Sequence, residues 1–169
     1  MSNTLVAYFS HPGENYVSGD IVNLPRGNAE VLADFAVAAT GADSFRIQRA
    51  EAYPAGYNDT VAVAREEKAA NARPALVADK DVAEYENVVL IYPNWCGTMP
   101  MAVYTWLEGH SFAGKSIYPL CTHEGSGLSA TESEIAAACP GANVQKGLGV
   151  LGSKAAQSEQ TVRDWLHAL

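Results

Sequence analysis

Two short segments near the start of the chain carry residues that could bind an anion. Residues 10–16 are polar and contain Ser10 and Gly13, and residues 27–29 precede an apolar helical pattern. Small and hydroxyl-bearing residues there let backbone N–H groups converge on a phosphate at a helix N-terminus, where the helix dipole is favourable. The segments lack the Gly-Lys-Ser/Thr of a P-loop and the G-x-G-x-x-G of a dinucleotide site. They indicate a phosphate site of another kind, or simple helix capping by Ser10 and Asn28.

A third segment, residues 92–100, reads YPNWCGTMP and places Trp95 between polar residues and glycine. An exposed indole is costly unless something flat covers it, so Trp95 is a candidate to stack on a planar ligand. The alternative is an indole folded back into the core beneath its own loop.

A fourth segment, residues 121–127, reads CTHEGSG and follows an expected strand. Its glycines and hydroxyls can offer hydrogen bonds to the polar edge of a ring, and it has no metal-ligand spacing, so we expect no metal. His123 beside Glu124 is a candidate acid/base pair. Ser126 between two glycines is a shorter motif than the G-x-S-x-G nucleophile elbow of hydrolases. A serine hydrolase that uses Ser126 with His123 is therefore the least favoured of the functions considered.

Strands must position these loops, and apolar runs and alternation predict strands at residues 4–9, 43–48, 88–92, 116–121 and 143–150. Helical periodicity and end signals predict helices at residues 28–41, 58–72, 101–107, 131–139 and 157–169. Strict alternation of strands and helices predicts an α/β fold: a doubly wound, five-stranded parallel sheet with helices on both faces, in a single domain over residues 1–169. Ligands bind such sheets at the carboxyl ends of the strands, where the candidate loops lie.

The composition excludes some classes of function. The 169 residues include 11 Lys+Arg and 19 Asp+Glu, a net charge of −8, which disfavours binding to nucleic acid or to anionic membranes. No apolar run approaches the about 20 residues of a membrane span, and no secretory signal is evident, so we expect a cytoplasmic protein. The three cysteines are expected to be free thiols.

The two loops at residues 92–100 and 122–127 resemble the Tyr-Pro-x-Trp-x-Gly-Thr-x-Pro and Thr-His-Glu-Gly-Ser-Gly motifs of the flavodoxin-like family. The resemblance spans nearly the whole chain. It implies strand order 2-1-3-4-5, noncovalent FMN at the carboxyl edge of the sheet, and redox chemistry. The chain would be an electron carrier or a small FMN-dependent reductase, and its partner a redox protein or a quinone-like acceptor.

Carried over by position, the resemblance assigns residues to the phosphate, to one side of the ring, and to its other side or polar edge. The residues expected to contact FMN are Ser10, Pro12, Gly13, Asn15, Asn28, Ala29, Pro93, Asn94, Trp95, Cys96, Gly97, Thr98, Thr122, His123, Glu124, Gly125, Ser126 and Gly127.

The phosphate loop departs from the family pattern. The family usually has threonine where Pro12 or Ala29 stands, and residues 14–26 are inserted. Asn15, Tyr16 or the inserted segment could replace the missing hydroxyls, and Arg26 could supply a counter-charge. A flavin-free module that binds a phosphorylated ligand or a protein is therefore the alternative function.

Overall fold

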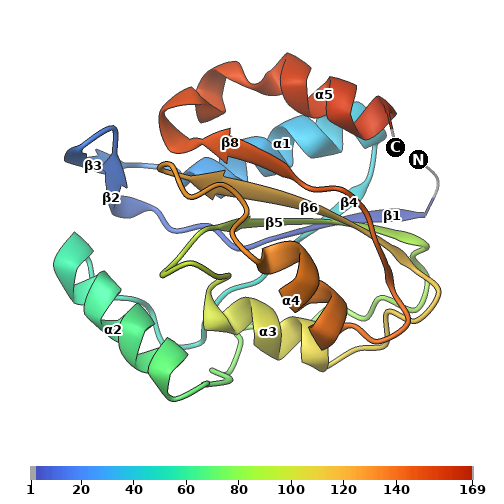
Figure 1. Cartoon of the computed structure of the whole chain (residues 1–169), viewed down its shortest axis with the longest axis horizontal. Helices are drawn as coiled ribbons and strands as arrows, with labels where there is room; N and C mark the ends of the chain where they lie inside the picture. Colours follow the sequence, from blue (N-terminus) through green and yellow to red (C-terminus); the bar gives the residue numbers. More distant parts are fainter. Residues whose placement is uncertain (1–2, 169) are drawn as a thin grey trace.

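The computed structural model describes residues 3–168 and shows a parallel sheet with helices on both faces (Figure 1). The strand order is β4-β1-β5-β6-β7, with β8 also paired to β6. The strands of this sheet are β1 (Thr4–Tyr8), β4 (Asp43–Arg46), β5 (Asn87–Pro93), β6 (Ser116–His123), β7 (Asn143–Val144) and β8 (Leu148–Leu151). With β7 and β8 together as the fifth strand, the predicted α/β fold and the order 2-1-3-4-5 are confirmed.

The predicted helices are confirmed, with ends that differ by a few residues. They are α1 (Asn28–Thr40), α2 (Tyr57–Ala69), α3 (Met101–Glu108), α4 (Thr131–Ala138) and α5 (Glu159–His167), and a short 3-10 helix η1 (Gly152–Gln157) precedes α5. One detail of capping is corrected. The N-cap of α1 is Gly27 rather than Asn28, which is the first helical residue.

The central strands bury both faces of the sheet. Along β5, Val88 and Leu90 pack into one apolar cluster, while Val89 and Ile91 pack into a second cluster. Buried residues of α3 and α4 complete the first cluster, and buried residues of α1 and α5 complete the second. Figure 1 shows these helix pairs on opposite faces of the sheet. Alternate side chains of a strand point to opposite faces, which is why a continuous apolar run predicts a strand covered on both sides.

The segment inserted after β1 forms a β-hairpin. The sequence predicted only an insertion into a loop at this place. Strand β2 (Gly13–Val17) pairs antiparallel with β3 (Asp20–Leu24). The turn residues Ser18 and Gly19 have φ values of 51° and 92°, the left-handed values that two-residue hairpin turns require. The hairpin and α2 lie at the same end of the sheet in Figure 1.

The last predicted strand, at residues 143–150, is divided into two. β7 pairs with the start of β6, and β8 pairs with its end, while residues 145–147 lie between the two strands. The carboxylate of Glu132 accepts a hydrogen bond of 2.8 Å from the N–H of Gly147 in this gap. The chain pairs with β6 on both sides of the interruption, but in two different registers.

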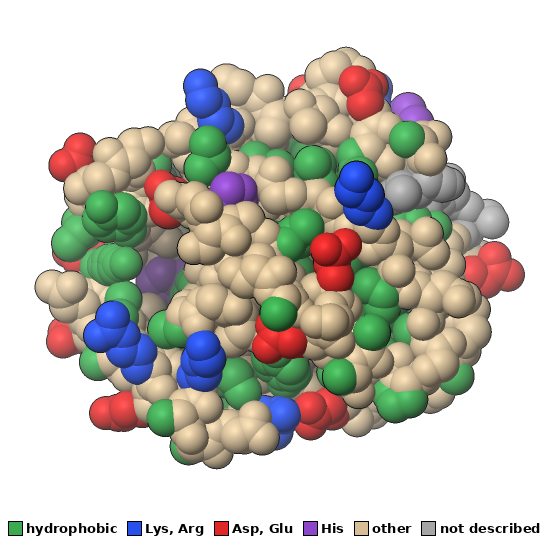
Figure 2. Space-filling view, viewed as in Figure 1, with side chains coloured by type: hydrophobic (Ala, Val, Ile, Leu, Met, Phe, Trp, Pro, Cys, Tyr) green, Lys and Arg blue, Asp and Glu red, His purple; other side chains and the backbone are tan. Residues whose placement is uncertain are grey.

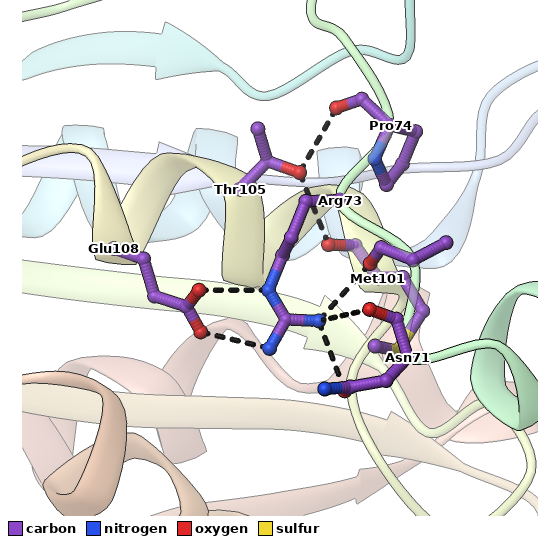
Figure 3. Close-up of polar contacts among 7 residues, drawn as sticks. Asn71, Arg73, Pro74, Met101, Thr105 and Glu108 are labelled. Carbon is purple, nitrogen blue, oxygen red and sulfur yellow. Dashed lines mark hydrogen bonds and ion pairs between the residues drawn. The ribbon is translucent and has the colours of Figure 1, made fainter.

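Helix α2 buries few residues, and its following segment is held to α3 by Arg73 (Figure 3). The Arg73 guanidinium donates to both carboxylate oxygens of Glu108, from Nε at 2.8 Å and from Nη2 at 2.9 Å. Its Nη1 donates to the side-chain and backbone oxygens of Asn71, at 3.1 and 3.2 Å. Thr105 Oγ1 donates to the carbonyl of Pro74 at 2.9 Å. These contacts fix the segment that follows α2, and helix α2 itself forms one wall of the cleft described below.

Replacing Arg73 with alanine is expected to lower the free energy of unfolding by about 1 kcal/mol, because a bidentate, partly shielded pair lies at the upper end of surface ion pairs. For a chain of this size, that corresponds to a fall in Tm of about 2–4 °C. Arg163→Ala is the matched control, since Arg163 makes only a single exposed contact with Glu159 within α5. Equal effects of the two substitutions in thermal denaturation would contradict the role given to Arg73.

Candidate functional site

The loop after β5 is a tight turn that presents Trp95. The N–H of Trp95 donates to the carbonyl of Thr98 at 2.8 Å, and the N–H of Thr98 donates back to Trp95 at 3.0 Å. Between them, Cys96 and Gly97 have φ values of 54° and 79°. Left-handed φ is uncommon for a residue with a side chain, so other contacts must hold Cys96 in place. Lys68 of α2 supplies one, because its ammonium donates to the carbonyl of Cys96.

The indole of Trp95 is half-buried against three other rings. Its centroid lies 5.2 Å from that of Phe9, 5.6 Å from His11 and 5.1 Å from Tyr53, and each pair is edge-to-face. The same residue also borders a cleft. The structure therefore combines the two readings of Trp95: the indole packs against the core and still contributes surface to the cleft.

The loop after β6 is fixed to the Trp95 loop by a single side chain, that of Asn94. Its Nδ2 donates to the carbonyl of Gly127 at 3.0 Å and to Ser129 Oγ at 2.9 Å, while its Oδ1 accepts from the N–H of Gly97 at 3.1 Å. The backbone N–H of Asn94 also donates to the carbonyl of Thr122 at 2.8 Å. The two loops thus keep a fixed spacing beside the indole.

The polar side chains of the second loop are occupied locally rather than with each other. His123 Nδ1 accepts the N–H of Gly125 at 2.9 Å, and Glu124 Oε2 accepts the N–H of Ser18 in the hairpin turn at 3.0 Å. Within the described residues, no hydrogen bond joins His123 to Glu124 or to Ser126. The acid/base pair and the serine hydrolase alternative therefore stay predictions that no side-chain contact of this structure supports.

The phosphate loop is built around the start of α1. Ser10 Oγ accepts the N–H of Glu30 at 3.2 Å, which makes the Ser10 hydroxyl a cap of the helix. Asn28 borders the cleft, whereas the side chain of Ala29 is buried in the core. Burial lowers the pKa of His11 in the same loop, which favours a neutral imidazole. Over residues 3–168, no acceptor binds the N–H groups of Asn28 and Ala29, and of these two residues Asn28 borders the cleft.

Arg26 does not supply the counter-charge that the sequence suggested. Its guanidinium pairs with the carboxylates of Asp34 and Glu30, and it does not line the cleft. Asn15 does border the cleft, but its amide donates to the carbonyls of His11 and Gly13 at 2.9 and 3.1 Å. Arg26 therefore supplies no counter-charge at the cleft, and the amide of Asn15 is already bound to backbone carbonyls.

The hairpin borders the cleft and is held at two points. Glu14 Oε2 accepts the N–H of Tyr57, the first residue of α2, at 2.8 Å. At the other end, Glu124 accepts the N–H of Ser18, as described above. Between these points, the rings of Tyr16 and Tyr57 meet edge-to-face with centroids 6.0 Å apart. The hairpin thus connects α2 to the loop after β6.

These elements enclose a cleft of about 320 Å³ at the carboxyl ends of the strands, a size typical of small-ligand sites. Figure 2 shows the molecular face that contains this hollow, with hydrophobic side chains beside it. We call its inner side the sheet-edge wall. This wall consists of Asn28, Pro93, Asn94, Trp95, Cys96, Gly97, Thr122, His123, Glu124, Ser126 and Gly152. We call the opposite side the outer wall, formed by Glu14, Tyr16, Tyr57, Val61, Ala64 and Arg65 of the hairpin and α2.

Most of the predicted contact residues lie in this cleft, and some do not. Of the predicted set, Asn15 and all of the sheet-edge wall except Gly152 border it. Seven residues do not line it: Ser10, Pro12, Gly13, Ala29, Thr98, Gly125 and Gly127. Thr98, for example, is buried, and its hydroxyl contacts Tyr104 and the carboxylate of Glu134.

Other residues of the cleft lie outside the sequence motifs that indicate a ligand site. Gly152 follows β8, where a Cβ would lie 2.4 Å from Glu124 Oε1 and 2.8 Å from Asn28 Nδ2. The face of α2 was read only as a helix, although the spacing of Tyr57, Val61 and Arg65 places them on one side.

The described part of the chain was compared with what a metal site and a membrane-spanning helix require. Among residues 3–168, no three His, Cys, Asp or Glu side chains gather as a metal site requires. No helix in the same range is long and apolar enough to cross a membrane. The cysteines are free thiols, as predicted: Cys121 and Cys139 are buried and Cys96 is exposed at the cleft.

Comparisons with known proteins agree with this geometry. A sequence model described as flavodoxin matches residues 3–169. A Bacteroides uniformis protein assigned to the flavoproteins is 28% identical, with a TM-score of 0.76 over 98% of this chain and 97% of its own. One from Bacteroides eggerthii is 26% identical, with a TM-score of 0.76 over 98% and 96%. A Lactobacillus acidophilus flavoprotein solved in complex with FMN shares the fold at 16% identity, with a TM-score of 0.64 over 94% and 98%. A search among curated proteins finds no match.

Proposed function

Because this chain belongs to the flavodoxin family, we propose that it binds one FMN noncovalently in the cleft and serves in electron transfer. The observation that carries the proposal is the junction of the two motif loops by Asn94 beside the indole of Trp95. That junction leaves a flat-sided cleft at the switch point of a doubly wound sheet, where such folds bind ligands.

The residues that line the cleft fit the ring of FMN, and Asn28 at the start of α1 lies where the phosphate would bind. Trp95, Cys96 and Gly97 would contact one side of the ring, and the loop from Thr122 to Ser126 would contact its other side or its polar edge. The free N–H groups at the start of α1 would hold the phosphate. Bound FMN supplies one- or two-electron redox chemistry, and the protein supplies position, hydrogen bonds and charge.

The test is titration of the FMN-free protein with FMN, followed by tryptophan fluorescence and thermal denaturation. At a ligand concentration about 100 times Kd, binding stabilises the folded state by about 2.7 kcal/mol, or roughly 5–10 °C in Tm for a chain of this size. Riboflavin is the control for the phosphate contacts and should bind more weakly. Fluorescence and Tm that FMN leaves unchanged would favour the flavin-free alternative instead.

The role in electron transfer has two forms, a carrier for a protein partner or a small reductase. We favour a reductase with a quinone-like acceptor, because the hairpin and Tyr57 cover the cleft and leave a second, outer wall facing it. NADPH oxidation in the presence of quinones tests this choice. A protein that exchanges electrons only with another protein would show none.

A further inference from the structure

The outer wall of the cleft has a chemistry of its own. From α2, Tyr57, Val61, Ala64 and Arg65 face the cleft on one side of the helix, and the hairpin adds Tyr16. None of these positions belongs to the motifs that indicate FMN. The outer wall therefore calls for an explanation beyond binding of the cofactor.

The aromatic and aliphatic part of this wall suits a flat, apolar ligand. Tyr16 and Tyr57 meet edge-to-face, so their rings present two differently oriented surfaces beside Val61. Tyr16 is 46% exposed, which is high for a large apolar ring. Aromatic side chains favour stacked or edge-on contact with other rings, and covering Tyr16 would remove apolar surface from water.

The charged end of the wall is Arg65. It lies on the exposed side of α2, and within the described residues no carboxylate forms an ion pair with it. Arg26, Arg49, Arg73 and Arg163 are paired with carboxylates, whereas Arg46 donates to the carbonyl of Ser10 instead. Figure 2 shows Lys and Arg side chains over α2, next to the hollow. An unpaired guanidinium beside a cleft, in a protein of net charge −8, favours an anionic group there.

We propose that the outer wall binds a planar aromatic anion, with its rings against Tyr16, Tyr57 and Val61 and its negative group at Arg65. The role of this ligand as an electron acceptor rests on the proposed function. A quinone of this class would gain two electrons and two protons from the dihydro form of FMN and become the hydroquinone. FMN would return to its oxidised form, and a reduced nicotinamide or a reduced protein would supply the dihydro form again.

The experiment measures binding by isothermal titration calorimetry, with two probes of the same ring system, anthraquinone sulfonate and hydroxymethyl anthraquinone. FMN loading is first measured by visible absorption, and the loaded, oxidised protein is then titrated at low salt. The sulfonate is expected to bind about threefold to fivefold more tightly, which is the upper part of the range of an exposed ion pair. Arg65→Gln should abolish this preference and leave the affinity for the neutral probe unchanged.

Two further variants separate the charge from the rings. Arg163→Gln removes the same charge from α5, away from the cleft, and should keep the preference for the sulfonate. Tyr16→Ala should weaken binding of both probes, and the Tm of each variant confirms that it is folded.

The outcomes distinguish the two proposals. Failure to load FMN contradicts the proposed function, and titration of the FMN-free protein then still tests the outer wall. A loaded protein that binds neither probe overturns the present inference alone. So does an Arg65→Gln variant that retains the preference for the sulfonate.

Discussion

Replacing Gly27 with alanine is expected to lower the free energy of unfolding by about 2–3 kcal/mol, the upper range for overpacking at a buried position. An added Cβ would lie 2.1 Å from Ser10 Oγ and 2.8 and 2.9 Å from the backbone O and N of His11. Because backbone atoms cannot move aside as a flexible side chain can, the loop after β1 must shift. Urea denaturation should show a lower midpoint, and affinity for FMN should fall because the same loop borders the proposed phosphate site.

Gly56→Ala is the matched control for this substitution. Gly56 is also a helix N-cap, that of α2, and its φ is −79°. The nearest atom to its added Cβ is Asp59 Oδ2 at 3.5 Å, an ordinary contact. We expect a change of at most a few tenths of a kcal/mol for Gly56→Ala. If the two variants unfold at the same urea concentration, the close approach of the chain at position 27 does not explain why a glycine stands there.

Replacing Trp95 with alanine is expected to weaken FMN binding by about thirtyfold to a hundredfold. The loss combines stacking, worth about 0.5–1.5 kcal/mol, with apolar contact area at roughly 25 cal/mol per Å². Every 1.4 kcal/mol corresponds to a factor of ten in Kd. The measurement is a titration followed by the visible absorption of FMN, which remains usable when the indole fluorescence is lost.

Trp95→Phe provides the control, since it keeps a flat ring in place and should lose only about threefold to tenfold in affinity. It also separates ligand contact from packing, because Trp95 contacts Phe9, His11 and Tyr53 and its removal will reduce stability too. Circular dichroism at the titration temperature must show that Trp95→Ala is folded. Unchanged FMN affinity in a folded Trp95→Ala variant would rule out stacking on the indole.

Much of the fold could be predicted because the apolar composition of the central strands indicates that they are buried. The apolar run of β5 leaves no polar face, and this indicates cover by helices on both sides, as the structure shows. The same strands end in the Trp95 and His123 loops, so parallel pairing alone brings these loops to one edge.

The hairpin was missed, although its signal was present. The strand-favouring pairs Tyr16-Val17 and Ile21-Val22 lie on either side of Ser18-Gly19, a dipeptide that favours a tight turn. A strand of the parallel sheet would have been buried, but this segment is mostly exposed, so its composition resembles that of a loop. The outer wall could not be predicted for a related reason: it depends on how the hairpin packs against α2, which no local pattern specifies.

The division of the last strand was also beyond the local pattern. Residues 143–150 contain enough β-formers for one strand, but the chain pairs with β6 at two separate registers. Gly147 lies close to Leu128 and to the carbonyl of Pro119, with 3.0 to 3.1 Å left for a Cβ. The tertiary packing of this glycine, rather than strand propensity, accounts for the change of register between the two strands.

This divided strand has a consequence for behaviour at high concentration. A long, straight outer strand offers a row of unpaired N–H and C=O groups on which another molecule can add, the first step toward fibrils. Here β7 has two residues and β8 has four, and the opposite border strand, β4, also has only four. Neither margin offers a template long enough for such growth, so the sheet is protected against polymerising through its margins.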